Sequence, residues 1–180
     1  MKIYNILEKQ LKPTAVALGY FDGMHIGHKK VISKTVELKK HGLTPTVFTF
    51  SCSPKSILSR VPEQKIMSID EKKNFLERMG VEILYIIDFL EIYKLKPNEF
   101  VKNILNEKLN AKTVVCGFNY HFGFGGSADA TDLKNLCSKY EIETKIIKPA
   151  LYERRPISST RIRKAIESSD AASVKNMLGD

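Results

Sequence analysis

Short apolar runs alternate with longer amphipathic segments along the chain. Five of the runs are rich in β-branched, aromatic and small apolar residues and have the length of buried strands. They cover residues 14–18, 44–50, 81–88, 113–116 and 142–148. In the segments between and after them, apolar residues recur at helical spacing among charged residues. These segments predict helices over residues 27–41, 70–79, 97–109, 130–140, 161–167 and 171–178.

The order of these elements predicts an α/β fold. Strands separated by helices of ten or more residues imply right-handed crossovers and parallel pairing. We therefore expect a doubly wound, parallel, five-stranded sheet with helices on both faces. In such sheets, ligands bind beyond the carboxyl ends of the strands, where the strand order reverses. Four turn-rich polar segments that follow strands should converge there, namely residues 19–28, 51–54, 117–127 and 156–163.

Length and composition limit the class of protein. The 180 residues suffice for one domain with its own core, and no internal repeat or clear domain boundary divides them. Hydrophobic residues at 43% and charged residues at 27% exclude collagen-like, coiled-coil and disordered chains. No apolar run approaches the roughly 18 residues of a membrane span, and the N-terminus is too polar for a signal peptide. We expect a single domain over residues 1–180, soluble and cytoplasmic, with no membrane partner.

The net charge and the cysteine content narrow the class of protein less than the length and composition do. The formal net charge of +9 suits polyanionic partners, but the basic residues are scattered and form neither a tail nor a stripe. A specific nucleic-acid partner is therefore not predicted. Cys52, Cys116 and Cys137 are widely separated and match neither a zinc spacing nor a disulfide framework. This pattern is typical of a reducing compartment, and we predict no metal site built from protein ligands.

The first polar segment, GYFDGMHIGH over residues 19–28, carries the strongest chemical signal. It joins a buried strand to a helix start, where free N–H groups and the helix dipole favour anions. Glycines let the backbone approach a ligand closely, and His25 and His28 lie about one helical turn apart. Two imidazoles in that position can donate hydrogen bonds to phosphate oxygens. The simpler alternative is that either histidine caps the helix or packs in the core.

Two further segments suggest ligand contacts. In ISSTRIR, residues 157–163, serine and threonine hydroxyls precede two arginines at a predicted helix start, as a second anion site would require. An ordinary helix cap with solvated arginines has the same pattern. In GFNYHFGFGG, residues 117–126, aromatic residues lie beside glycines and a polar Asn119. These rings would stack on a flat heterocycle or else anchor the loop on the sheet.

These three segments together resemble a known family. GYFDGMHIGH is similar to the H-x-G-H signature of nucleotidyltransferases with a Rossmann-like fold. Its fuller form resembles the adenylyltransferase module of bacterial bifunctional riboflavin kinase/FAD synthetases. GFNYHFG and ISSTRIR are similar to two further elements of that family, in the same order and at the same spacings. The resemblance covers essentially the whole chain. It implies an FMN adenylyltransferase domain of the nucleotidyltransferase type. The riboflavin kinase module of that family has no counterpart in residues 1–180, as in a stand-alone adenylyltransferase or a fragment, so we expect no riboflavin kinase activity.

The resemblance implies the transfer of AMP from ATP to FMN, giving FAD and pyrophosphate, with Mg²⁺ bound to ATP. The ionised FMN phosphate would attack the α-phosphorus in line, so catalysis would be positioning and charge neutralisation. The catalytic residues would be His25, His28, Ser159, Thr160 and Arg163. The nucleotide would contact Gly19, Tyr20, Phe21, Asp22, Gly27, Gly117, Asn119 and Arg161. The flavin would contact Phe50, Ser53, Pro54, Asn119, Tyr120 and Phe122. A separate riboflavin kinase is then a candidate partner.

One segment departs from the family pattern. After the second strand the family usually reads F-D-P-H-P, a segment implicated in flavin binding, whereas this chain reads FSCSP at residues 50–54. The first Phe and last Pro remain, but the acid and the histidine are absent. The altered segment favours a non-catalytic flavin or nucleotide sensor as one alternative. Two more stay open: a nucleotidyltransferase with another phosphorylated acceptor, and a nucleic-acid-binding protein, which only the net charge favours.

Overall fold

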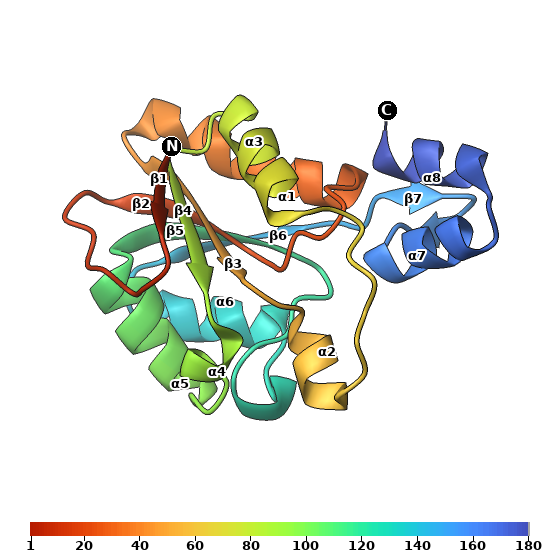
Figure 1. Ribbon diagram of the computed structural model, residues 1–180. Coiled ribbons are helices and arrows are strands. Elements are labelled where there is room, and N and C mark those ends of the chain that lie inside the picture. Colours follow the sequence, from red (N-terminus) through yellow and green to blue (C-terminus); the bar gives the residue numbers. More distant parts are fainter. Residues whose placement is uncertain (180) are drawn as a thin grey trace.

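The computed structural model describes residues 1–179; Asp180, the last residue of the predicted domain, lies outside the described part. A central sheet of six parallel strands runs in the order β1-β4-β3-β2-β5-β6 (Figure 1). The strands are β1 (Lys2–Tyr4), β2 (Thr14–Leu18), β3 (Thr44–Phe50), β4 (Ile83–Ile87), β5 (Ala111–Gly117) and β6 (Glu143–Ile147). The predicted parallel α/β fold is confirmed.

The sheet has one strand more than predicted. β1 pairs with β4 at the edge of the sheet, where the amide of Lys2 donates to the carbonyl of Glu82 at 2.8 Å. Tyr4 stacks on Tyr85, with ring centroids 5.1 Å apart. A strand of three residues is too short to show a periodicity in the sequence. Its structure depends on pairing with β4, which the local pattern does not reveal.

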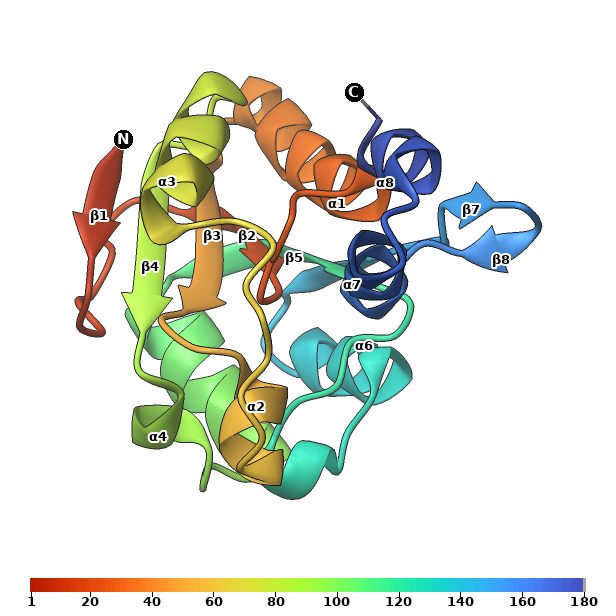
Figure 2. The same ribbon diagram turned by 45° about the vertical axis from the view of Figure 1, so that its right-hand side comes forward.

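Helices cover both faces of the sheet (Figures 1 and 2). One face carries α1 (Ile26–Glu37), which continues into the short η1 (Leu38–His41), and α3 (Ile69–Arg78). The other carries α6 (Ala130–Ser138) and a helix that begins as α5 (Pro97–Glu99) and continues as the π-helix η2 (Phe100–Lys108). A capping box of Ser68 and Glu71 opens α3, and Pro97 occupies the first turn of α5.

Alternate residues of the inner strands β2 to β5 enter two different cores. In β2, Ala15 and Ala17 face the core beneath α1 and α3, whereas Val16 and Leu18 face the core beneath η2 and α6. All four side chains are at most 2% exposed. This double burial explains why β2 to β5 read as nearly continuous apolar runs in the sequence, whereas β6, at the edge of the sheet, has no fully buried residue.

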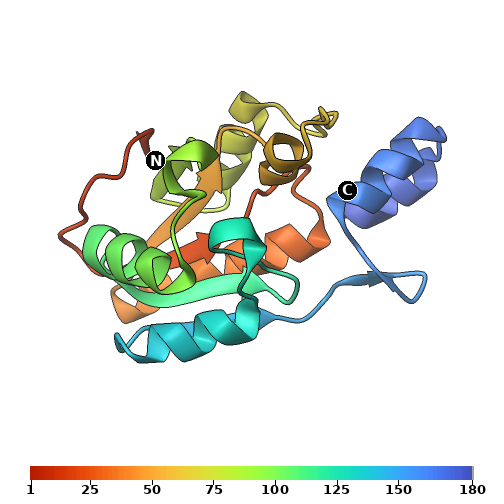
Figure 3. The ribbon, with the colours of Figure 1, turned by 90° about the horizontal axis from the view of Figure 1, so that it is seen from below.

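The remaining elements lie at the carboxyl ends of the strands or beyond them. The connections contain α2 (Pro54–Ser59), α4 (Phe89–Ile92) and η3 (Phe124–Gly126), which the sequence pattern did not predict. After β6 come a small antiparallel hairpin, β7 (Leu151–Tyr152) and β8 (Arg155–Pro156), and the helices α7 (Ser159–Glu167) and α8 (Ala171–Leu178). The α7–α8 pair projects beyond the sheet (Figure 3), with Ile26 and Ile66 packed against its small core.

No helix among residues 1–179 is long and apolar enough to cross a membrane. The strand order reverses beside β2, since the chain passes from β2 to β3 and β4 on one side and returns to β5 and β6 on the other. The carboxyl ends of β2 and β5 therefore form the switch point at which ligands bind in sheets of this type.

Candidate active site

The loop that leaves β2 holds an unusual backbone conformation. Phe21, Gly23 and Met24 have φ angles of 53°, 79° and 42°, in the left-handed region. Two of these are not glycines, and such conformations cost on the order of 1–3 kcal/mol unless the surroundings enforce them. Here the side chains of Phe21 and Met24 are each 1% exposed and packed in the core beneath α1. The core thus fixes the loop, and the loop fixes the start of α1.

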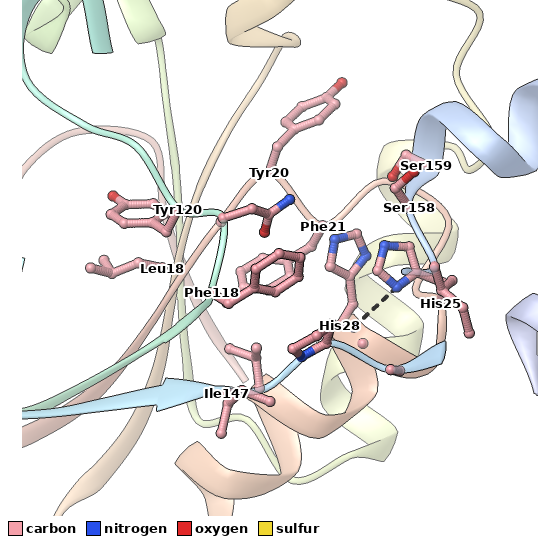
Figure 4. Close-up of a pocket in the computed structure, with 18 of the residues that line it drawn as sticks. Leu18, Tyr20, Phe21, His25, His28, Phe118, Tyr120, Ile147, Ser158 and Ser159 are labelled. Carbon is pink, nitrogen blue, oxygen red and sulfur yellow. Dashed lines mark hydrogen bonds between the residues drawn. The ribbon is translucent and has the colours of Figure 1, made fainter. Parts of the chain in front are cut away.

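The two histidines lie at that helix start (Figure 4). His25 is the N-cap of α1, and its Nδ1 accepts a hydrogen bond from the backbone N–H of His28 at 3.3 Å. The imidazole rings stack with centroids 3.6 Å apart and planes 18° apart. His28 also meets the ring of Phe21 edge-on at 5.3 Å. The spacing of the motif thus brings both imidazoles together at the helix N-terminus.

The close approach of the His25 ring to position 27 explains why a glycine stands between the two histidines. A Cβ placed on Gly27 would lie 3.0 Å from Cε1 and 3.1 Å from Nδ1 of His25. The absence of a side chain therefore lets the His25 ring fold back over the first turn of the helix. The glycine of the H-x-G-H motif therefore makes room for the ring of the first histidine.

Both histidines are held neutral. Burial lowers the pKa of His25 to about 4, although a hydrogen bond with its own backbone opposes the shift. Burial also holds the pKa of His28 well below its usual value, and the electrostatic effects of the neighbouring His25 and Lys72 act in the same direction. Because Nδ1 of His25 accepts a hydrogen bond, its proton is on Nε2. Nδ1 of His28 is buried without a hydrogen-bond partner among residues 1–179.

The lowered pKa of His25 predicts an acid-sensitive fold. The unfolded chain takes up a proton near pH 6.5, whereas the folded chain resists it until about pH 4. The free energy of unfolding should therefore fall as the pH drops through this window, by up to about 3 kcal/mol from this group. Urea denaturation at pH 7 and pH 4.5 measures the loss. His25→Asn, which keeps a capping acceptor but does not titrate, should lose less; an equal loss in both proteins would contradict the assignment.

A second helix N-terminus faces the histidines. Ser158 caps α7 by accepting a hydrogen bond from the N–H of Arg161, and Ser159 Oγ donates to the carbonyl of Asp22 at 2.9 Å. Ser158 and Ser159 lie across from the imidazoles (Figure 4). The first N–H groups of a helix are free to bind an anion. The starts of α1 and α7 therefore enclose a space suited to phosphate groups.

The two arginines of ISSTRIR are engaged elsewhere in this structure. Arg163 forms an ion pair with Asp22 at 2.7 Å and donates to the carbonyl of Gln64 at 2.8 Å. Asp22 also accepts from the backbone amides of Ile66 and Met67. Arg161 donates to three carbonyls of the β7–β8 hairpin, those of Tyr152, Arg155 and Pro156. Asp22 and the arginines thus tie α7 and its neighbouring segments to the β2–α1 loop.

A cavity of about 370 Å³ lies between these elements, at the predicted switch point. It brings together most of the residues singled out in the sequence. These are Gly19, Tyr20, Phe21, His25, Gly27, His28, Phe50, Pro54, Gly117, Asn119, Tyr120, Ser159 and Thr160. The described structure does not place Asp22, Ser53, Phe122, Arg161 or Arg163 in this lining. Ser53 instead caps α2 and donates to Glu63 at 2.7 Å.

A second cavity, of about 480 Å³, adjoins the first. Its walls are mainly aromatic and apolar: Phe50, Leu58, Phe89, Ile92, Tyr93, Phe100, Tyr120 and Phe122. Phe50 meets Phe89 edge-on at 5.3 Å, and Tyr120 stacks on Phe122 at 5.9 Å. Phe50, Pro54, Tyr120 and His121 line both cavities. The two spaces are therefore neighbours that share one wall.

Sequence reasoning missed several lining residues. Phe89 and Tyr93 come from α4 and the residue that follows it, a helix too short for its periodicity to be visible. Lys148 and Pro149 follow β6. The sequence pattern placed Lys148 inside the strand, and the position of Pro149 directly after it was the signal that could have identified both. Within the described chain, no cluster of three His, Cys, Asp or Glu side chains could hold a metal ion.

The chain is similar to known proteins over most of its length. The FAD synthetase family model matches residues 7–161. A bifunctional riboflavin kinase/FMN adenylyltransferase of Bacillus subtilis is 32% identical over 186 residues, covering 98% of this chain and 56% of that protein. An FAD synthetase of Listeria monocytogenes is 30% identical over 174 residues, covering 95% of this chain and 70% of that protein.

A solved structure is also similar. A Streptococcus pneumoniae protein described as a macrolide-efflux protein superposes with a TM-score of 0.86 at 33% identity, covering 99% of this chain and 70% of that one. The chain spans little more than half the length of the Bacillus relative. The match over residues 7–161 nevertheless includes the H-x-G-H loop, both cavities and the start of α7. The chain belongs to the FAD synthetase family.

Proposed function

We propose that this protein is an FMN adenylyltransferase, which transfers AMP from ATP to FMN and releases pyrophosphate. The observation that carries the proposal is the pair of adjoining cavities. One is bounded by two helix N-termini and two imidazoles, as a polyphosphate requires, and the other is lined by aromatic rings, as a flavin requires. The family and the printed activities of its relatives support this assignment.

The arrangement suggests how the substrates would meet. With ATP in the first cavity and the isoalloxazine ring in the second, the FMN phosphate would lie at the shared wall. An oxygen of that phosphate forms a bond to the α-phosphorus of ATP. The bond breaks between the α-phosphorus and the oxygen that bridges the α- and β-phosphorus atoms. Pyrophosphate carries away that electron pair. The FMN phosphate is already ionised at neutral pH, so this step needs no general base.

Particular groups have particular roles in this proposal. Neutral imidazoles of His25 and His28 donate hydrogen bonds to phosphate oxygens, while hydroxyls and free amides at the start of α7 hold the departing pyrophosphate. Arg163 would have to leave Asp22 to join them. The described residues provide no carboxylate cage, so Mg²⁺ would enter bound to ATP, through phosphate oxygens and water.

We also propose the substrates, partners and cellular compartment of the enzyme. ATP and FMN are its substrates, and no nucleic-acid or membrane partner is proposed. We place the reaction in the cytoplasm and assign the phosphorylation of riboflavin to a riboflavin kinase activity outside residues 1–179.

The test mixes the protein with ATP, Mg²⁺ and either FMN or riboflavin, and follows FAD and pyrophosphate by chromatography. We expect FAD from FMN and no product from riboflavin.

Phe89→Ala should raise the KM for FMN about tenfold, because it removes an aromatic wall of the second cavity, and leave the KM for ATP unchanged. Leu90→Ala, a neighbour that is 55% exposed, is the matched control. ATP binding without FAD formation would instead favour another acceptor or a non-catalytic sensor.

A further inference from the structure

A buried lysine beneath the β2–α1 loop has no part in the mechanism above. Lys72 lies on α3 and is 3% exposed. Its Nζ donates to the backbone carbonyl of Tyr20 at 2.7 Å, and Thr49 Oγ1 donates to the same oxygen at 2.8 Å. The ammonium also lies 4.4 Å from the centroid of the Tyr20 ring. Tyr20 in turn lines the first cavity.

Burying an ammonium is unfavourable, so its position calls for a reason. Burial lowers the pKa of Lys72 to about 8; Lys65 acts in the same direction, and Asp22 opposes both. The group therefore stays mostly charged at neutral pH. Asp22 already pairs with Arg163 at 2.7 Å and accepts from two backbone amides. Arg163 also lies 3.6 Å from Glu63, which in turn pairs with Lys55 at 3.0 Å. Two carboxylates therefore face three cations, which leaves positive charge beneath the loop.

That charge reaches the cavity. The field of Lys72 contributes to the lowered pKa of His28, whose imidazole is part of the cavity wall. In the partly buried setting of this loop, a fixed charge is screened less than one on the surface. A lysine needed only as a hydrogen-bond donor to Tyr20 would duplicate the donor that Thr49 already supplies.

We propose that Lys72 is a positioning residue of the nucleotide cavity, which holds Tyr20 at the cavity wall and supplies a buried positive charge that attracts the polyphosphate of the nucleotide. The proposal rests on the proposed function only in that the first cavity receives ATP. It is independent of the identity of the acceptor. Because the effect is electrostatic, it should grow with the charge of the ligand.

The test measures the affinities of adenosine, AMP, ADP and ATP by calorimetry, without an acceptor. Lys72→Gln keeps a hydrogen-bond donor for Tyr20 but removes the charge. We expect it to weaken ATP about tenfold, which corresponds to about 1.4 kcal/mol, to weaken ADP and AMP progressively less, and to leave adenosine unchanged. Lys72→Arg, which keeps the charge, should restore most of the ATP affinity.

The matched control is Lys73→Met on the same helix. Lys73 pairs with Asp70 at 3.0 Å on the surface, so its replacement removes the same formal charge without touching the loop. Equal losses for adenosine and ATP would show a merely structural role and overturn the proposal. So would an ATP affinity unchanged in Lys72→Gln, or a loss in Lys73→Met as large as in Lys72→Gln. A wild-type protein that binds no adenine nucleotide would overturn the proposed function as well.

Discussion

Replacing His28 with alanine should lower the rate of FAD formation by about 100-fold or more and leave the protein folded. The ring stacks on His25 at 3.6 Å and lines the cavity between the two helix N-termini. Losing one hydrogen-bond donor aimed at developing charge typically costs about 100- to 1000-fold in rate. The loss should fall mainly on kcat, since the interaction strengthens as the bond to the α-phosphorus breaks.

The fold should tolerate this change for a specific reason. Nδ1 of His28 is buried without a partner among the described residues, so the imidazole is not optimally placed for stability. Alanine removes that unpaired group but also loses the packing against Phe21. We expect the free energy of unfolding, measured in urea, to change by about 1 kcal/mol or less. Steady-state kinetics and urea denaturation of the same preparation separate the two effects.

His41→Ala provides the control, because His41 is exposed in η1 and touches neither cavity. It should match the wild type in both measurements. A His28→Ala protein that forms FAD as fast as the wild type would remove the imidazole from the mechanism. A protein that fails to fold would show instead that His28 is a core residue, the simpler alternative that the sequence left open.

The sequence predicted the fold well because the signals were long and repeated. Strands β2 to β5 appeared as apolar runs since both faces of the sheet are covered there, and β6 was recognised although it is a partly exposed edge strand. The predicted helices at residues 70–79 and 97–109 begin within one residue of the observed starts, where Ser68 caps α3 and Pro97 occupies the first turn of α5. The elements that escaped prediction depend on tertiary contacts. β1 is three residues long and is held by β4, and α4 is a single turn capped by Asp88. Neither has a local pattern long enough to recognise.

The residues of the candidate site also divide into those with a local sequence signal and those placed by tertiary contacts. The spacing of Gly19, Gly27 and the two histidines of residues 19–28 was visible because it is local, and the structure brings these residues to the wall of the first cavity. The ion pair of Asp22 with Arg163 joins residues 141 positions apart, which no spacing reveals. Lys72 stands beside Lys73 in the sequence as an ordinary basic pair, yet one is buried and the other pairs on the surface. Burial on one face of α3 makes that distinction.

Gly27→Ala should reduce FAD formation about tenfold with almost no loss of stability. The added Cβ would lie 3.0 Å from the His25 ring, so the ring must shift by a few tenths of an ångström away from the first turn of α1. A displacement of about 1 Å in a catalytic group can cost about 100-fold in rate, so this smaller shift should cost about tenfold. Alanine is the better helix former by about 1 kcal/mol, which offsets the steric cost in the folded state. Kinetics and urea denaturation again provide both measurements.

A double-mutant cycle identifies His25 as the group through which Gly27 acts. Ser33→Ala, at an exposed position of the same helix, should leave activity unchanged. In a His25→Ala background, where no imidazole remains to be displaced, adding Gly27→Ala should lower the rate by less than about twofold. If the two substitutions instead multiply, the glycine acts directly on the nucleotide rather than through the histidine. The close approach of Gly27 to His25 would then be a consequence of the helix start, and the H-x-G-H spacing would serve ligand contact with the backbone.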